Sequence, residues 1–352
     1  MIMTTKEKVL KVLAEAKGQA VSGEALAAEC GVSRAAIWKA VNTLREAGNQ
    51  IEGTTNGGYV LSDDDVFTAE LFKDIFSSHF PDFSDSHIEC FKEIDSTNTY
   101  AKRLLAEPGT GKKYHKAIFI AEKQTSGRGR IGRTFVSPAK SGIYFSLIYT
   151  PEGGIQEPAK LTACTAVAVC RAIKKLYNYD AKIKWINDIF ANGKKICGIG
   201  TEGITNFETG MIESAIIGIG INVHKDTTSF SPELSKTAGS LEEALNTEET
   251  GSSFTLNRAQ LAAEVCGQVL KIFEEDNSNA ASHAAIIKEY KEASFLLGRE
   301  LTVFPLIGDQ NSSYKATATD IDENAGLIVT LADGTTKTLS SGEVTLRSGN
   351  FN

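Results

Sequence analysis

Residues 117–138 read AIFIAEKQTSGRGRIGRTFVSP, in which an apolar run leads into a loop with three arginines and three glycines within eight residues. The run IFIA predicts a buried strand. Glycines let a backbone curl closely around a ligand, and arginines carry charged forks that suit phosphate or carboxylate groups. The loop has neither the spacing of a P-loop nor that of a dinucleotide-binding fingerprint. We therefore expect an anion-binding loop at the end of a strand, with a solvated basic loop as the alternative.

The surrounding region, residues 88–276, alternates strand-like and helix-like patterns. Three further runs predict strands: IYFSLIYT at 143–150, IKWI at 183–186 and SAIIGIGINV at 214–223. Residues 159–177 predict a largely buried helix. This order predicts a mixed α/β domain, and the chemistry is expected there.

Polar and basic side chains lie at the ends of these predicted elements. Residues 95–98, DSTN, precede a helix, where they either cap it or bind a polar head group. In IKWINDIFANGKKICGIG, the amide and carboxylate of residues 187–188 follow a strand. The Asn-Gly pair at 192–193 predicts a hairpin turn that folds the lysines of 194–195 back alongside that strand. GIGINV places Asn222 at the end of another apolar strand.

The N-terminal part predicts three helices. The third helix, SRAAIWKAVNTLREAG, is expected to be capped by Ser33 and to end at Gly48. Its residues Ile37, Val41 and Leu44 lie at spacings of four and three, so they share one face that can pack on the first two helices.

The opposite face of this helix offers side chains that can reach base edges and phosphates in a major groove. These candidate DNA-binding residues are Ser33, Arg34, Ala35, Trp38, Lys39 and Asn42. Trp38 borders both faces of the helix, so its sequence position leaves open whether it points to DNA or into the core. The next segment, IEGTTNGGYVL, predicts a hairpin with a two-residue turn at Asn56-Gly57, which completes a winged helix-turn-helix pattern. Residues 1–62 carry seven Lys and Arg against six Asp and Glu, a formal charge of +1, whereas the whole chain carries -7. This contrast favours a DNA-binding module, and a helical packing or dimerisation domain is the alternative.

Three domains are expected, at residues 1–64, 65–294 and 295–352. The aspartate run in SDDDVFTAE indicates a solvated first boundary. In the last domain, the short runs LTVFPL, YKATATDI, LIVTL and TKTL predict a small antiparallel barrel.

Composition narrows the class of protein. The chain is 41% hydrophobic and 23% charged, as expected of a soluble globular protein. It has no run of the roughly 20 apolar residues that cross a bilayer and no apolar signal core, so we expect a cytoplasmic protein without a membrane partner. The six cysteines form no C-x-x-C pair and the five histidines are scattered, which argues against a zinc site or disulfide framework.

Together, these motifs resemble the signature segments of biotin protein ligases. In chain order they are DSTN, SGRGRIGR, KWINDI followed by KKICGI, and GIGINV, which is the usual order in that family. The helix SRAAIWKAVNTLREAG with its wing TTNGGYVL resembles the bifunctional members, which are also biotin-dependent transcriptional repressors. The resemblance covers nearly the whole chain. It implies a multidomain α+β protein with a central class II synthetase-like ligase domain and a C-terminal SH3-like barrel.

The resemblance also implies an activity. Biotin and ATP, with Mg²⁺, would give biotinyl-5′-adenylate, and biotin would then pass to one lysine of a biotin carboxyl carrier protein. The implied catalytic residues are Lys195, Arg128, Arg130 and Asp188, of which Asp188 is also the candidate magnesium ligand. The implied biotin-binding residues are Ser96, Thr97, Asn98, Gln124, Arg128, Arg130 and Lys195. The implied ATP- or adenylate-binding residues are Gly127, Arg130, Arg133, Phe135, Lys184, Asn187 and Asn222.

Two positions depart from the family pattern. Ile186 stands where the family usually has proline, and Phe135 stands where it often has tryptophan. Neither change removes a charged group, so we expect altered affinity at most. The segment at 224–240, HKDTTSFSPELSKTAGS, falls in a region that helps cover the adenine in the family, but its residues cannot be matched individually.

Other interpretations remain: a lipoate-type ligase, a ligand-sensing repressor without transfer activity, and a plain nucleotide-binding protein. A lipoate ligase would carry a different glycine-rich segment and usually no winged helix. A single recognition helix offers few base contacts, so we expect a homodimer, formed when the adenylate is bound, to meet operator DNA.

Overall fold

The computed structural model describes residues 3–346 except 17, 47–50, 55–56, 62–64, 66, 108, 207, 227–228, 247–255, 279 and 306–311. The chain divides into two compact units. The first comprises Met1–Pro81 and Thr255–Ala263, and the second comprises Asp82–Phe254 and Glu264–Asn352.

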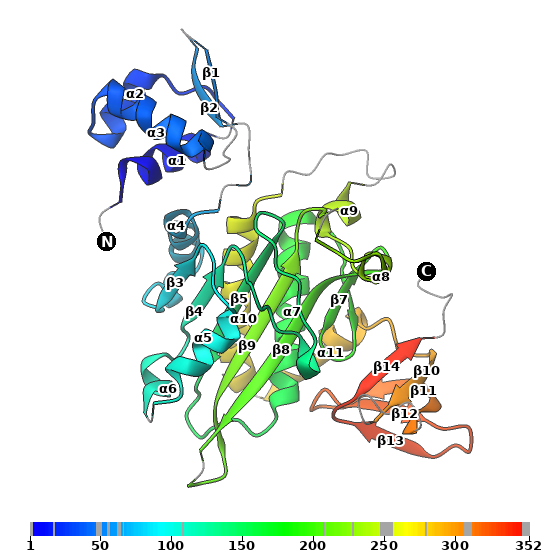
Figure 1. The fold of residues 1–352 in the computed structure, drawn as a ribbon. Helices are drawn as coiled ribbons and strands as arrows, with labels where there is room; N and C mark the ends of the chain where they lie inside the picture. The colour runs from blue at the N-terminus through cyan, green and yellow to red at the C-terminus, as the bar shows by residue number, and fades with distance from the viewer. Residues whose placement is uncertain are drawn as a thin grey trace. The chain divides into compact units, whose positions relative to one another are not determined.

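The first unit begins with the predicted helices and hairpin (Figure 1). Its elements are α1 (Thr5–Glu15), α2 (Gly23–Cys30), α3 (Arg34–Glu46), β1 (Ile51–Thr54), β2 (Gly58–Leu61) and α4 (Ala69–His79). Ile37, Val41 and Leu44 of α3 are buried in one core with α1 and α2, as predicted. The Ser33 hydroxyl caps α3 by accepting the Ala36 backbone N–H at 3.2 Å. The predicted helix end at Gly48 lies outside the described residues.

The wing is an antiparallel pair in which Thr54 lies opposite Gly58. This register leaves three residues between the strands, one more than the predicted two-residue turn; 55 and 56 lie outside the described residues. Val21 adds a bridge to Tyr59, and both backbone hydrogen bonds of that bridge are present. The wing is therefore held on the helical core by backbone pairing as well as by apolar packing.

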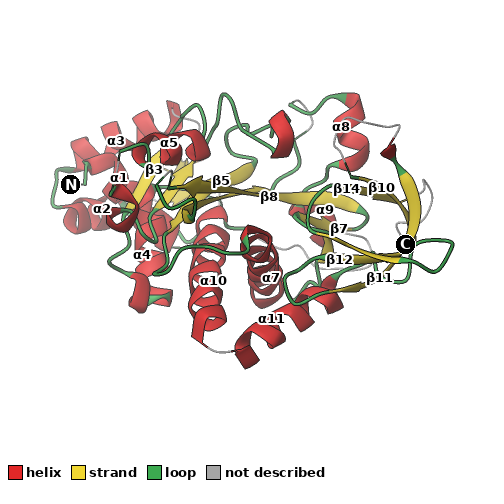
Figure 2. Cartoon of the chain, turned by 90° about the horizontal axis from the view of Figure 1, so that it is seen from below, coloured by secondary structure: helices red, strands yellow, loops and turns green. Residues whose placement is uncertain are grey.

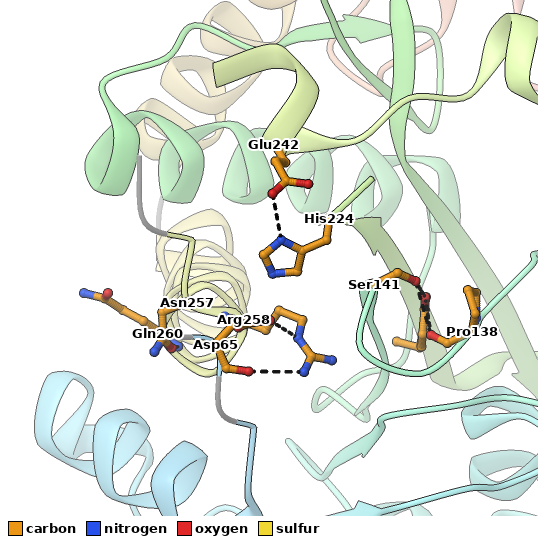
Figure 3. A network of polar contacts seen from close by, with 9 residues as sticks. Asp65, Pro138, Ser141, His224, Glu242, Asn257, Arg258 and Gln260 are labelled. Carbon is orange, nitrogen blue, oxygen red and sulfur yellow. Dashed lines mark hydrogen bonds and ion pairs between the residues drawn. The ribbon is translucent and has the colours of Figure 1, made fainter. Parts of the chain in front are cut away.

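A buried ion pair lies elsewhere in the first unit. The Arg258 backbone N–H donates to Asp65 Oδ1 at 2.5 Å, and its guanidinium also contacts the Asp65 carboxylate (Figure 3). Arg258 is only 3% exposed. Because breaking a buried pair leaves an uncompensated charge, this contact fixes the segment that follows the wing to the first turn of the helix starting at Arg258.

The second unit is built on a seven-stranded sheet in the order β3-β4-β5-β9-β8-β7-β6. The strands are β3 (Ile88–Phe91), β4 (Ile118–Ala121), β5 (Gly142–Tyr149), β6 (Lys182–Lys184), β7 (Asp188–Ala191), β8 (Lys194–Thr205) and β9 (Ile212–Asn222). Only β3 and β4 pair in parallel; the other neighbours are antiparallel. The predicted mixed sheet is confirmed.

Helices cover both faces of this sheet. The helices from this part of the chain are α5 (Thr97–Leu104), α6 (Thr110–Lys113), α7 (Pro158–Tyr177), α8 (Pro232–Thr237), α9 (Leu241–Leu245), α10 (Arg258–Ser278), whose first residues belong to the first unit, and α11 (Ala280–Ala293). Helices α7 and α11 pack against one side of the sheet, and α5 lies on the other (Figure 2). The buried helix predicted at 159–177 is α7, and most of its residues are buried.

The region that carries the predicted amide and lysines consists of two successive hairpins. The first pairs Lys184 with Asp188, so β6 is shorter than the predicted strand IKWI and residues 185–187 form its turn. The second places Ala191 opposite Lys194 across Asn192 and Gly193, whose φ angles are 46° and 71°. Because such angles suit a two-residue hairpin turn, the Asn-Gly prediction is confirmed.

The C-terminal part is an antiparallel sheet in the order β13-β12-β11-β10-β14. Its strands are β10 (Glu300–Phe304), β11 (Tyr314–Ile321), β12 (Leu327–Thr330), β13 (Thr336–Leu339) and β14 (Glu343–Leu346). The first four match the predicted runs, and β14 was not predicted. A hydrogen bond of 2.8 Å from Trp185 Nε1 to the Ala325 carbonyl connects this sheet to the β6–β7 turn. Among the helices in the described ranges, none has both the length and the hydropathy of a membrane span.

Candidate functional site

A cleft of about 490 Å³, partly open to solvent, lies on the sheet face that α5 covers. It is bordered by the start of α5, the glycine-arginine loop and strands β8 and β9. Most of the predicted ligand-binding residues meet there. The predicted residues that line the cleft are Ser96, Thr97, Asn98, Gln124, Arg128, Arg130, Phe135, Asn187 and Lys195.

The floor of the cleft is made of glycines, a feature the sequence analysis missed. Gly198 pairs with Gly220 and Gly200 pairs with Gly218, so four positions on one face of β8 and β9 carry no side chain. A Cβ on Gly218 would lie 2.3 Å from Asn98 Oδ1, and one on Gly220 would lie 2.5 Å from the Phe135 ring. The signal was the two-residue spacing of glycines in GIG and GIGIN, but the pairing that joins them requires the sheet register.

One end of the cleft is neutral and closely hydrogen-bonded. The Thr97 backbone N–H donates to Gln124 Oε1 at 2.8 Å, and Gln124 Nε2 donates to Ser137 Oγ at 3.0 Å. Ser146 Oγ, on β5, lies 2.7 Å from Thr97 Oγ1 and 2.5 Å from Asn98 Oδ1. Ser96, which also lines this end, caps α5 and is buried. These groups can hold a polar, uncharged head.

The other end is cationic. Lys195 Nζ lies 2.7 Å from Asp188 Oδ1, and Arg130 Nη1 donates to Asn187 Oδ1 at 2.6 Å. The Asn187 amide in turn donates to Asp188 Oδ1 at 2.9 Å. Arg128 lines the same cleft with an exposed side chain. Positioned cations of this kind can lower the repulsion between two reacting anions.

Two predicted adenylate-binding cations lie outside the lining of the cleft. Burial lowers the pKa of the Lys184 ammonium, against the opposing effect of the Asp188 carboxylate. Arg133 donates two hydrogen bonds, of 3.1 and 2.7 Å, to Glu343 of β14, 210 residues away. That bond raises the pKa of Arg133 and lowers that of Glu343. The arginine therefore contacts the C-terminal sheet, a partner that no local pattern could reveal.

Two further predicted residues support the site without lining it. The Asn222 amide donates to the Gly239 carbonyl at 3.0 Å and is buried. A Cβ on Gly127 would lie 2.3 Å from the Phe135 carbonyl oxygen, so this glycine permits a close approach within the loop. Ile186, the position of the expected proline, follows a cis peptide bond and accepts a hydrogen bond from Tyr290 at 3.1 Å.

The segment after β9 returns to the cationic end. The Gly239 N–H donates to the Lys195 carbonyl at 2.9 Å, so this backbone lies beside the candidate catalytic lysine. In the same segment, His224 Nδ1 lies 3.5 Å from Glu242 (Figure 3). The contact of Gly239 with Lys195 therefore fixes the end of this segment next to the cleft.

The recognition face of α3 is a second candidate site, in the first unit. Trp38 is 62% exposed, which settles its orientation: it points away from the helical core. Arg34, Ala35 and Lys39 are also exposed, and Asn42 is half-buried. One helix therefore presents two cations, an indole and an amide, the chemistry that reads bases and phosphates.

Potential metal ligands are dispersed over the described residues. Within the part of the chain that the structure describes, no three His, Cys, Asp or Glu residues come together as a possible metal cluster. Asp188 is a carboxylate at the cationic end of the cleft, where it contacts Lys195.

Sequence comparisons identify two matching families. The model of the Biotin/lipoate A/B protein ligase family matches residues 90–222, and an HTH domain model matches residues 5–60. The bifunctional ligase/repressor BirA of Bacillus spizizenii is 30% identical over 349 residues, which cover 97% of this chain and 98% of that protein. The bifunctional ligase/repressor BirA of Escherichia coli is 28% identical over 349 residues, 98% of each chain.

A similar fold occurs in a biotin protein ligase from Aquifex aeolicus, whose structure is in complex with biotin and ATP. That structure matches with a TM-score of 0.58 and 23% identity, covering 74% of this chain and 98% of that chain. At this identity the match shows a shared fold.

Proposed function

The chain belongs to the family of bifunctional biotin protein ligases and repressors, and from this premise we propose how its cleft carries out the reaction. The single observation that carries the proposal is the arrangement of the cleft. A neutral polar end and a cationic end are separated by a floor without side chains. A flat ligand with a polar head and a carboxylate tail fits that arrangement.

At the neutral end, Ser96, Thr97, Asn98 and Gln124 hold the ureido head of biotin. Their donors and acceptors lie on adjacent segments and are already positioned by hydrogen bonds. The glycine floor lets the ring system lie against β8 and β9, with Phe135 beside it. This places the carboxylate toward the arginines and Lys195.

At the cationic end, an oxygen of the biotin carboxylate attacks the α-phosphate of ATP and pyrophosphate leaves. Arg128, Arg130 and Lys195 neutralise the two anions as they approach and stabilise the charge that develops on the phosphate. The uncharged amine of the acceptor lysine then attacks the acyl carbon, and AMP leaves. Asp188, 2.7 Å from Lys195, accepts a hydrogen bond from the incoming amine and orients it.

The remaining predicted nucleotide-binding residues act around this centre. Gly127 allows the loop to close, and Asn187 holds Arg130 in place. Asn222 fixes the backbone beside Lys195 through Gly239. Lys184 and Arg133 lie outside the cleft lining, so their share in nucleotide binding is electrostatic.

Mg²⁺ enters with ATP. Proteins usually bind Mg²⁺ through one or two carboxylates together with substrate phosphates, and Asp188 supplies a carboxylate of that kind. The ion would neutralise charge on the phosphates when bound.

The ligase activity is tested by incubating the protein with labelled biotin, ATP, Mg²⁺ and a purified biotin carboxyl carrier domain. We expect ATP-dependent labelling of the wild-type domain and none when its acceptor lysine is replaced by arginine. Labelling of the arginine form at the same rate would contradict specific transfer.

The repressor activity is assigned to the winged helix of residues 1–64, with catalysis in 65–294 and 295–352 as the C-terminal domain. One recognition helix offers few base contacts, so two chains are needed to read an operator. We expect biotinyl-adenylate to favour the homodimer. Sedimentation with and without biotin and ATP tests this, and a monomer-dimer equilibrium indifferent to ligand would contradict it.

A further inference from the structure

Glu202 of β8 lies outside the residues assigned to the site, yet it contacts one of them. Asn98 Nδ2 donates to Glu202 Oε1 at 2.9 Å. Ser146 on β5 pairs with Gly218 on β9, and Gly218 pairs with Gly200 on β8. Across these three strands, Ser146 is therefore the only one of the three paired residues that has a side chain. Asn98 lies over Gly218 and bridges from Ser146 to the carboxylate.

Three groups around the neutral end can act in only one way in a hydrogen bond, either as a donor or as an acceptor. The Glu202 carboxylate and the Phe135 carbonyl only accept, and the Thr97 backbone N–H only donates. The amides and hydroxyls between these three groups must therefore be oriented so that each acceptor faces a donor and the N–H faces an acceptor. These three groups therefore determine the orientation of the Asn98 and Gln124 amides.

Starting at Glu202 and moving into the pocket, the donor and the acceptor of each hydrogen bond can be assigned in turn. We call this series of assignments the proton order of the pocket. The carboxylate takes an Asn98 N–H, so Asn98 Oδ1 faces Ser146. At 2.5 Å two acceptors would repel, so the Ser146 proton lies on that contact. The Thr97 proton then goes to Ser146 Oγ at 2.7 Å, because Ser146 has only one proton to give.

The other end of the chain agrees with this order. Ser137 Oγ donates to the Phe135 carbonyl at 2.9 Å and accepts from Gln124 Nε2, so Gln124 Oε1 faces Thr97. Thr97 Oγ1 also lies within hydrogen-bond distance of Gln124 Oε1, at 3.2 Å. Because the single Thr97 proton is placed on the shorter, 2.7 Å contact to Ser146, both of these oxygens are left as acceptors. A ligand N–H can satisfy both. The second N–H of each amide remains to meet a ligand oxygen.

We propose that Glu202 is a positioning residue that fixes the proton order of this pocket, so that the pocket selects a cyclic urea over an analogue whose urea oxygen is replaced by an N–H donor. The inference rests on the proposed function, because it takes the biotin head to be the occupant of the neutral end. Lys102, 3.7 Å from the other carboxylate oxygen, lies on the solvent side of this pair.

The test is Glu202→Gln. A glutamine can present either an oxygen or an N–H to Asn98, so the direction of the chain is no longer fixed. We expect the KM for biotin to rise about tenfold, the scale of one hydrogen bond, with kcat within about twofold. Affinity for the analogue bearing =NH in place of the urea oxygen should fall less. The biotin-to-analogue preference therefore decreases. Lys102→Gln, which leaves the carboxylate in place, should change neither affinity nor preference.

A second set of variants distinguishes loss of the hydrogen-bond pattern from misfolding. Asn98→Asp sets two carboxylates against each other, whereas Asn98→Asp combined with Glu202→Gln lets the introduced carboxylate accept from both Ser146 and the new amide. We expect the double variant to bind biotin more tightly than Asn98→Asp alone. An equal loss for biotin and the analogue in Glu202→Gln, no loss at all, or no recovery in the double variant would overturn the proposal.

Binding of biotin and the analogue should be measured by calorimetry without ATP, alongside the transfer assay. If the parent binds biotin with the expected preference but transfers none, the proposed function fails and the comparison still decides the role of Glu202. If the parent binds no biotin, both are overturned.

Discussion

The cleft and the recognition face of α3 hold similar side chains in different ways. In the cleft, Lys195 contacts Asp188 and Arg130 contacts Asn187. The two partners are adjacent residues of the β6–β7 hairpin, whereas Arg130 comes from the glycine-arginine loop. On α3, Arg34 and Lys39 have no ion-pair partner among the described residues and are exposed. The cleft fixes Lys195 and Arg130 before a ligand arrives, whereas α3 leaves Arg34 and Lys39 free to adapt.

The difference between fixed cations in the cleft and free cations on α3 fits the different requirements of catalysis and DNA binding. A reacting centre gains rate when its charges are positioned in advance, because no reorganisation is needed as the bond forms. A DNA-binding surface gains affinity from releasing counterions, which requires only that cations reach phosphates. Substitutions in the cleft should therefore cause large losses in reaction rate or biotin binding that depend on the exact position. Substitutions on α3 should cause smaller losses, and only in DNA binding.

The largest expected effect comes from removing the cation at the centre of the cleft. We expect Lys195→Ala to slow formation of biotinyl-adenylate by about 10²–10³-fold, the cost of losing one positioned group that stabilises developing charge. Lys194→Ala is the matched control, because this neighbouring lysine is half-exposed and lies 4.0 Å from Glu243 at the surface. Pyrophosphate exchange measures both. Equal losses in the two variants would show that general surface charge, and not position, supports the reaction.

The next effect concerns the floor. Gly218→Ala would place a Cβ 2.3 Å from Asn98 Oδ1, so Asn98 must move. We expect a loss of about 1–3 kcal/mol in unfolding free energy, as for other overpacked sites, together with weaker biotin binding. Gly200→Ala meets nothing within 4 Å, so it should retain its stability while its new methyl group obstructs the ligand. Urea unfolding and calorimetry separate the two; equal stability of both variants would contradict the crowding of Asn98.

A smaller effect is expected on the recognition face. Trp38→Ala should weaken binding to DNA selected by the adenylate-loaded parent by about tenfold, within the range for losing one base-pair contact. Biotin transfer should be unchanged, because Trp38 is on α3. Met211→Ala removes the other large apolar side chain that is exposed among the described residues, and it serves as the control. A Trp38 variant with full DNA affinity would remove the indole from the recognition surface.

The smallest effect is expected at the Arg133–Glu343 pair. Hydrogen bonding by Arg133 lowers the pKa of Glu343, so the stability it contributes is present above the ordinary pKa of 4.5 and is lost as pH falls through the lower, folded value. Glu343→Gln should reduce stability at pH 7 by less than about 1 kcal/mol, because Arg133 is 64% exposed.

Urea unfolding of parent and Glu343→Gln at pH 7 and below pH 4.5 checks this sign. The stability difference between them should shrink in acid. A difference that widens in acid would mean that the pair does not act as an ion pair.

The two regions were not equally predictable from sequence. The face of α3 follows from helical periodicity alone, so Ile37 and Val41 were correctly placed inside and Lys39 outside. Trp38 lies at the border of the two faces, and only the structure places it. The Asn192-Gly193 turn was predictable because its geometry is local.

The cleft depends on contacts that periodicity does not contain. Arg133 could not be separated from Arg130 by any local pattern, because its partner Glu343 is on a distant strand. The link between Asn98 and Glu202 spans 104 residues. The glycine floor was visible as a repeat of two, but its pairing required the register of β8 with β9.

We expect one cleft first to make biotinyl-adenylate and then to hold it. The most direct measurement loads the protein with labelled biotin, ATP and Mg²⁺ without acceptor, removes free ligand, and then adds the carrier domain. We predict about one labelled adenylate bound per chain, released only when its biotin appears on the acceptor lysine. Label that reaches the acceptor without ATP, or a bound adenylate that the acceptor does not discharge, would contradict the account.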